Sequence, residues 1–146
     1  MMKRSGLVCI INISEDREGS EHDVERLIKL YNDLNFTFFS FDQLESKKSV
    51  VKKTQSSPSQ NAELYCYSNL TKQEIFDLVT NFAENDTIKG PRFLYIMSHG
   101  DRDRPNCLID VKNISYHEND ILKKFTTAKV PHLKDELKCI VFNCCR

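Results

Sequence analysis

The chain has 146 residues, of which 40% are hydrophobic and 29% charged, and its 21 basic and 21 acidic side chains give a formal net charge of zero. The length and composition fit one globular domain, residues 1–146, with a core of its own. The balanced charge disfavours binding to nucleic acid or to an anionic membrane, and no apolar run reaches the roughly 20 residues that span a bilayer.

The beginning of the chain and its cysteines indicate a reducing compartment. Met1 to Arg4 is basic and precedes a short apolar stretch, as in a signal peptide, but no small-residue cleavage site follows and the stretch continues into a strand–helix pattern. The six cysteines include no Cys-x-x-Cys pair and no zinc spacing with histidine. We therefore expect a cytoplasmic chain with reduced thiols, without a metal or other cofactor, in which Cys9 and Cys139 are inert core residues.

The first part of the chain predicts a strand, a helix and a second strand. The continuous apolar run Leu7–Ile13 is typical of a strand buried on both faces of a parallel sheet. Ser20 with Asp23 resembles a capping box, and apolar residues then recur at helical spacing, so a helix is expected over about 22–34. The aromatic run 36–41 predicts the second strand.

Residues 46–62, approximately, are expected to form a flexible insertion. The segment is rich in Lys, Ser and Gln and has almost no large apolar residue, so burial cannot offset the entropy of ordering it. A basic arm that binds nucleic acid is the alternative, and it is disfavoured because no aromatic residues are interleaved with the lysines.

The second half of the chain completes an alternating pattern. Thr71 with Glu74 predicts a capping box, and an apolar helical stripe follows that ends before Lys89-Gly90-Pro91. Further elements are expected at residues 92–97 (third strand), 108–111 (short strand at the rim), 121–125 (short helix) and 137–142 (fourth strand). Strands that alternate with helices predict an α/β fold with a mostly parallel sheet flanked by helices.

Two of these strands lead to residues with chemical potential. Ser98-His99-Gly100 follows the third strand, and Asn143-Cys144-Cys145-Arg146 follows the fourth. Functional residues of parallel sheets lie beyond the carboxyl ends of the strands, so His99 and Cys145 are expected at one edge of the sheet. A base activates a thiol as a nucleophile, and Gly100 lets a substrate carbonyl approach the backbone. Each residue alone is explained as well by a loop histidine or a chain-end thiol, and the pair favours catalysis.

These residues resemble the caspase family. Ser98-His99-Gly100 resembles the caspase histidine motif, and Asn143 to Arg146 resembles the end of the nucleophile motif Gln-Ala-Cys-Arg-Gly. The spacing is also similar, because Cys145 follows His99 by 46 residues and about 50 are expected in the family. Residues 17–24 resemble the Arg-x-Gly-Thr segment that opens the first caspase helix, and residues 130–142 resemble the approach to the nucleophile strand. The likeness covers about Leu7 to Arg146 apart from the insertion and matches the caspase large subunit.

The resemblance implies a caspase-like three-layer fold and an endopeptidase, made as a zymogen, that cleaves after aspartate in apoptosis or immune signalling. It implies that Cys145 is the nucleophile, that His99 is the acid–base, and that the N–H groups of Gly100 and Cys145 form the oxyanion hole. Arg17 is then one of the arginines that hold the substrate aspartate, because a guanidinium meets a carboxylate with two parallel hydrogen bonds. Without the resemblance, Arg17 is explained equally well as a solvated loop arginine.

The chain departs from the family pattern at two positions beside the nucleophile. Asn143 stands where the family usually has glutamine, and this shorter amide should reach less far into the aspartate pocket. Cys144 stands where the family has alanine, and strand alternation predicts that it packs under the strand rather than reacts. A disulfide between Cys144 and Cys145 would be strained and is not expected.

The largest departure is that the small-subunit strands of caspases are missing from this chain. Its last strand would leave an open sheet edge, so we expect it to pair with a small subunit, from the same precursor or a separate chain. A second large and small pair, or another caspase, is the further partner that the family implies. If Met1 is the natural start, the short segment before the first strand leaves no room for a long recruitment prodomain, and an effector-like or regulatory relative is expected.

The sequence leaves two functions open. The first is an active subunit of an endopeptidase acting on peptides or proteins that contain aspartate, and the intact His99, Gly100, Cys145 and Arg17 favour it. The second is a non-catalytic or weakly active partner that regulates another caspase, which Asn143 favours. A related clan of peptidases that prefers arginine or lysine is disfavoured, because its pocket should be acidic and Arg17 is basic.

Overall fold

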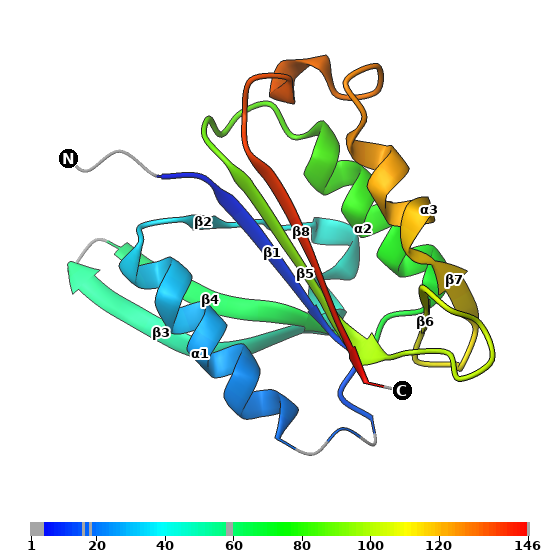
Figure 1. Cartoon of the computed structure of the whole chain (residues 1–146). Coiled ribbons are helices and arrows are strands. Elements are labelled where there is room, and N and C mark those ends of the chain that lie inside the picture. Colours follow the sequence, from blue (N-terminus) through cyan, green and yellow to red (C-terminus); the bar gives the residue numbers. More distant parts are fainter. Residues whose placement is uncertain (1–4, 16, 18, 58–59, 146) are drawn as a thin grey trace.

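The structure is a computed structural model that describes the backbone of residues 5–15, 17, 19–57 and 60–145, and the side chains of these residues except 52–57, 60–62 and 145 (Figure 1). The strands are β1 (Leu7–Asn12), β2 (Thr37–Phe38), β3 (Lys48–Ser57), β4 (Gln60–Ser68), β5 (Arg92–His99), β6 (Cys107–Ile109), β7 (Ser115–His117) and β8 (Lys138–Cys145). The helices are α1 (Ser20–Asp33), α2 (Lys72–Glu84), α3 (Glu118–Leu122) and the short 3-10 turns η1 (Asp42–Lys47), η2 (Lys123–Phe125) and η3 (Pro131–Leu133).

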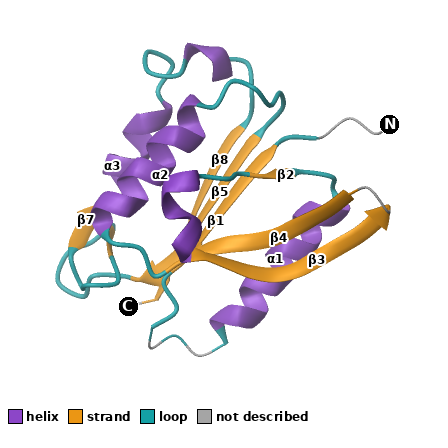
Figure 2. Ribbon diagram, turned by 180° about the vertical axis from the view of Figure 1, so that it is seen from behind, coloured by secondary structure: helices purple, strands orange, loops and turns teal. Residues whose placement is uncertain are grey.

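A six-stranded sheet forms the middle layer of the fold. Its strand order is β3-β4-β1-β5-β8, with β2 paired to the first residues of β1 and β4 paired to its last. The pairs that involve β1, and the pair β5–β8, are parallel, whereas β3 and β4 are antiparallel. Helix α1 covers one face of the sheet, and α2 and α3 cover the other (Figures 1 and 2). The predicted three-layer α/β fold with a mostly parallel sheet is confirmed.

Strand β1 lies at the centre of the core. All six of its residues are buried, because one set of alternate side chains faces α1 and the other faces α2. Val8 and Ile10 belong to the cluster that includes Ile28 of α1, and Cys9 and Ile11 belong to the cluster that includes Phe82 of α2. This two-sided burial explains the continuous apolar run in the sequence.

The two long helices begin in different ways. The capping box predicted for Ser20 and Asp23 is absent: Gly19 is the N-cap of α1, at φ 78°, and makes no side-chain cap bond. Glycine adopts a left-handed φ without strain, so Gly19 can take the N-cap position. The helix therefore begins at the next residue, Ser20, two residues before the predicted start. The predicted capping box of α2 is confirmed, because Thr71 Oγ1 accepts from Glu74 N at 3.2 Å and a Glu74 carboxylate oxygen accepts from Thr71 N at 2.9 Å.

The segment predicted as a flexible insertion, about 46–62, contains regular secondary structure. Strands β3 and β4 pair antiparallel from Lys48↔Tyr67 to Ser57↔Gln60. The prediction considered only side-chain burial, whereas here backbone hydrogen bonds join two strands and Leu64 to Tyr67 bury the base of the hairpin against the sheet. The structure therefore has a β-hairpin in a segment that was expected to be flexible. The domain limits, residues 1–146, stay a prediction.

The second predicted strand, 36–41, is shorter in the structure. Only Thr37 and Phe38 pair with β1, and Phe39 and Phe41 instead bury their rings in the core. Aromatic alternation alone does not distinguish a strand from a core-lining connection.

None of the helices in the described ranges is long and apolar enough to cross a membrane.

A buried carboxylate fixes the turn after β6 to the start of α2. Asp110 is 2% exposed, and one of its oxygens accepts a hydrogen bond from Lys72 N at 2.7 Å. The other oxygen accepts from Lys112 N and Ile114 N, both at 2.8 Å. A carboxylate that receives a helix-start N–H also interacts favourably with the helix dipole. Asp110 therefore anchors the turn that lies beside the end of β5.

Replacing Asp110 should destabilise the fold. We expect Asp110→Ala to lower the free energy of unfolding by about 3 kcal/mol, because three backbone N–H groups lose a charged acceptor in a buried place. Asp86→Ala removes an exposed carboxylate and should change the free energy by less than about 0.5 kcal/mol. Urea denaturation followed by circular dichroism measures both values, and equal effects of the two substitutions would contradict the assignment.

Candidate catalytic site at the ends of two parallel strands

The ends of β5 and β8 bring the two residues predicted to be catalytic next to each other. The strands pair in register from Arg92↔Lys138 to His99↔Cys145, so His99 and Cys145 are direct partners on neighbouring strands. Figure 1 shows the carboxyl ends of both strands at the same end of the sheet. The predicted neighbourhood of these strands is confirmed, and it depends on the backbone alone, since the side chain of Cys145 lies outside the described residues.

The ring of His99 is held by a backbone carbonyl. His99 Nε2 lies 3.1 Å from the carbonyl oxygen of Glu15, in the loop between β1 and α1. A carbonyl oxygen only accepts hydrogen bonds, so Nε2 carries the proton and donates it. In the neutral ring this leaves Nδ1 as the nitrogen that accepts a proton. The arrangement thus fixes the tautomer that a general base requires.

Arg17 lies at the same end of the sheet as His99. Its side chain is half-buried, and Nη1 donates to Asn12 Oδ1 at 2.7 Å and to the carbonyl oxygen of Ile13 at 3.2 Å. Asn12 is the last residue of β1 and pairs with Met97 of β5. The loop after β1 therefore carries both Arg17 and the carbonyl that holds His99.

Gly100 and Cys144 occupy supporting positions. The backbone of Gly100 forms an antiparallel bridge with Leu108, which joins the end of β5 to β6. Cys144 pairs with Ser98, is half-buried and packs against the core cluster on the α2 side of the sheet. The expectation that Cys144 is a packing residue agrees with this position.

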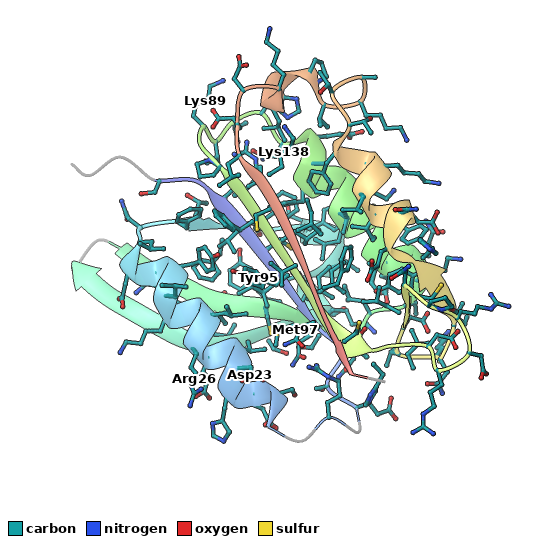
Figure 3. The ribbon with its side chains drawn as sticks, viewed as in Figure 1. Asp23, Arg26, Lys89, Tyr95, Met97 and Lys138 are labelled. Atoms are coloured by element: carbon teal, nitrogen blue, oxygen red, sulfur yellow. The ribbon has the colours of Figure 1, made fainter. Side chains whose placement is uncertain are left out.

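Asn143 lines a hollow on the α1 side of the sheet. Its exposed side chain lines a hollow of about 570 Å³ between α1 and the strands β5 and β8, and Arg17 is not among the lining residues. Figure 3 shows Asp23 and Arg26 on α1 and Tyr95 and Met97 on β5, which line the hollow. Leu27, Leu30, Val141 and Phe142 complete the lining. Asn143 and Arg17, the two residues expected to bind substrate, do not both line this hollow.

Two contacts at the candidate site were missed by sequence reasoning. The carbonyl of Glu15 is a backbone atom, so no residue type marks it. Asn12 had a signal that could have been used, because it is the one polar residue within the apolar run 7–13. In the described part of the chain, no group of three or more His, Cys, Asp and Glu side chains could hold a metal ion.

The thiols within the core are poor nucleophiles. Burial raises the pKa of Cys9 far above its ordinary value, and the neighbouring thiol of Cys66 raises it further. Burial likewise raises the pKa of Cys66. Cys9 is therefore an inert core residue, as predicted. Cys139, also predicted to be in the core, is only half-buried, because β8 lies at the edge of the sheet.

Alkylation should separate these cysteines. We expect iodoacetamide at pH 8 to modify Cys9 and Cys66 of the native chain at least about tenfold more slowly than Cys107 and Cys139, because Cys9 and Cys66 are buried and the other two are only half-buried. Peptide mass spectrometry gives the rates, and the urea-denatured chain, in which all thiols should react alike, is the control. Rapid modification of Cys9 in the native chain would count against its assignment.

Comparisons with known proteins show which proteins this chain resembles. The caspase domain family model matches residues 5–146. Cell death protein 3 of Caenorhabditis remanei is 29% identical over 83 residues, which are 57% of this chain and 16% of that protein.

Solved structures show the same fold. The Drosophila initiator caspase Dronc is similar with a TM-score of 0.68 and 21% identity, over 94% of this chain and 47% of that one. Caspase-1 from Spodoptera frugiperda is similar with a TM-score of 0.71 and 20% identity, over 98% of this chain and 48% of that one. The chain therefore spans about half the length of these structures and 16% of the curated relative.

Proposed function

This chain belongs to the caspase family, and from that premise we propose that it is the large-subunit part of a cysteine endopeptidase that cleaves peptide bonds after aspartate. The observation that carries the proposal is the register of β5 and β8, which pairs His99 with Cys145 at the strand ends. The hydrogen bond from His99 Nε2 to the Glu15 carbonyl supports it, because it leaves Nδ1 to act as the base.

The proposed reaction proceeds through an acyl-enzyme. The thiol of Cys145 transfers its proton to His99 Nδ1, and the thiolate attacks the main-chain carbonyl carbon of the substrate aspartate. The N–H groups of Gly100 and Cys145 hold the oxyanion of the tetrahedral intermediate. His99 then gives the proton to the leaving amine, and a water molecule, deprotonated by His99, hydrolyses the thioester. Arg17 binds the aspartate carboxylate by paired, charge-assisted hydrogen bonds.

We propose a small subunit as the partner that completes the site. In the described residues β8 pairs only with β5, so its other edge presents backbone N–H and C=O groups to a further strand. The hollow beside this edge is lined in part by Leu27, Leu30 and Val141, which a partner would bury. The small subunit comes from the same precursor or a separate chain, and a second large and small pair, or another caspase, joins it.

The setting of the activity belongs to the same proposal. A zymogen precursor, a cytoplasmic location and a role in cell death or immune signalling are what the family favours, and one similar protein is named Cell death protein 3. Peptides and proteins that contain aspartate are the proposed substrates.

A regulator of another caspase is the second candidate function. The observation that favours it is Asn143, whose exposed amide lines a hollow that Arg17 does not line. A chain that binds a caspase without completing an aspartate pocket would act as an inhibitor or as an activating partner.

Substitution at the paired strand ends tests the proposed function. In the complete precursor with its small subunit, Cys145→Ala and His99→Ala should each lower kcat/KM for an aspartyl peptide by about 10³-fold or more. Cys144→Ala, the matched control, should retain activity within about threefold, because Cys144 packs against the core. An aspartyl fluoromethyl ketone should label Cys145, as mass spectrometry can show. A wild-type protein that remains unlabelled yet binds another caspase would establish the regulator instead.

Lengthening the amide at position 143 gives a second test. We expect Asn143→Gln to raise kcat/KM for aspartyl peptides about fivefold, the equivalent of one added neutral hydrogen bond in the aspartate pocket. Asn143→Ala is the control and should not raise it. Steady-state kinetics on the complete enzyme measures both variants, and an unchanged or lower kcat/KM for Asn143→Gln would show that the longer side chain does not reach the substrate.

A further inference from the structure

The position of Arg17 depends on a buried amide that the proposed reaction does not use. Asn12 is 5% exposed, and its Oδ1 accepts a hydrogen bond from Arg17 Nη1 at 2.7 Å. The carbonyl oxygen of Ile13 accepts from the same nitrogen at 3.2 Å. Nη1 carries two N–H groups, so both of its donors are directed at the end of β1.

The remaining donors of Arg17 lie on one edge of the guanidinium. In the part of the chain that the structure describes, no acceptor bonds to Nε or Nη2 of Arg17. The N–H groups of Nε and Nη2 point in parallel and together bind a carboxylate with two hydrogen bonds. The contacts of Nη1 thus determine which edge of the guanidinium is presented.

Asn12 itself is held rigidly. It pairs with Ser68 of β4 on one side and with Met97 of β5 on the other. Its carbonyl oxygen accepts from Asn69 N at 2.9 Å, and the next residue, Ile13, donates its N–H to the carbonyl of Met97 at 2.8 Å. Arg17, by contrast, lies in the loop between β1 and α1. Asn12 is the fixed member of this pair and Arg17 the one that it orients.

We infer that Asn12 is a positioning residue for substrate recognition: its amide oxygen holds Arg17 Nη1, so that the Nε–Nη2 edge faces the aspartate carboxylate. The inference rests on the proposed function, which assigns the substrate carboxylate to Arg17. A neutral amide suits this role better than a carboxylate would. It orients the guanidinium and leaves its positive charge for the substrate, whereas an aspartate at this position would pair with Arg17 and compete.

Selectivity between two substrates tests the inference in the complete precursor with its small subunit. The measurement is the ratio of kcat/KM for matched peptides with aspartate or asparagine at the cleaved position. This ratio does not depend on the fraction of folded enzyme, so a merely structural role of Asn12 leaves it unchanged. We expect Asn12→Ala and Asn12→Asp each to lower the ratio about tenfold or more, mainly through a higher KM for the aspartyl peptide.

Ser49→Ala is the matched control. It removes the hydrogen bond of 2.9 Å between Ser49 and Ser68, the strand neighbour of Asn12, without a contact to Arg17. Its selectivity ratio should stay within about twofold of the wild type. If Asn12→Ala does not fold, Asn12→Asp, which preserves the size and shape of the side chain, carries the same expectation.

The outcomes separate the inference from the proposed function. A wild-type enzyme that cleaves after aspartate, with a ratio that neither substitution at Asn12 changes, overturns the inference alone. A wild-type enzyme that cleaves neither peptide overturns the proposed function, and the inference with it. A ratio that falls in both variants and holds in Ser49→Ala supports the positioning role.

Discussion

The parallel pairing of β5 with β8 is the constraint on which the candidate site depends. A shift of one residue between these strands would place His99 opposite Cys144 and reverse the faces of every side chain on β8. The start of β5 is fixed by Arg92, whose buried guanidinium donates to the carbonyl oxygens of Gly90, Asn85 and Ile88 in the preceding loop. The pairing of β5 with the buried strand β1, from Leu7↔Arg92 to Asn12↔Met97, fixes the position of β5 along its length. A contact at one end of the sheet thus helps to set the geometry at the other.

The sheet and the loop after β1 contribute different properties to the site. Parallel strands determine which residues are neighbours, because their carboxyl ends meet at one edge. They do not determine which nitrogen of His99 carries the proton, nor which edge of Arg17 is presented. Both are decided by Asn12 and Glu15, through the Asn12 amide and the Glu15 carbonyl. Ser14 N donates to Asn69 Oδ1 at 3.0 Å, which holds this segment to the end of β4. Orientation at the site therefore comes from a loop that the sheet holds in place.

Much of this arrangement could be predicted from the sequence, and the misses have physical reasons. Apolar runs revealed β1, β5 and β8, and the residues after two of them revealed the strand ends that meet. The hairpin β3–β4 was missed because backbone pairing leaves no mark in a polar sequence. The start of α1 was misjudged because Gly19, rather than Ser20, takes the N-cap position. The contacts of His99 and Arg17 arise from tertiary proximity, which motif spacing does not report.

The placement of the proposed nucleophile, Cys145, at the end of β8 has a thermodynamic consequence. In the described residues β8 pairs only with β5, so a strand added along its other edge and a group bound at its end act on the same segment. By linkage, each of these binding events changes the binding free energy of the other by the same coupling free energy. Occupancy of the site and assembly of the sheet are then coupled equilibria, and a ligand bound at the strand end would change the subunit dissociation constant by the same factor with which assembly changes the affinity for that ligand.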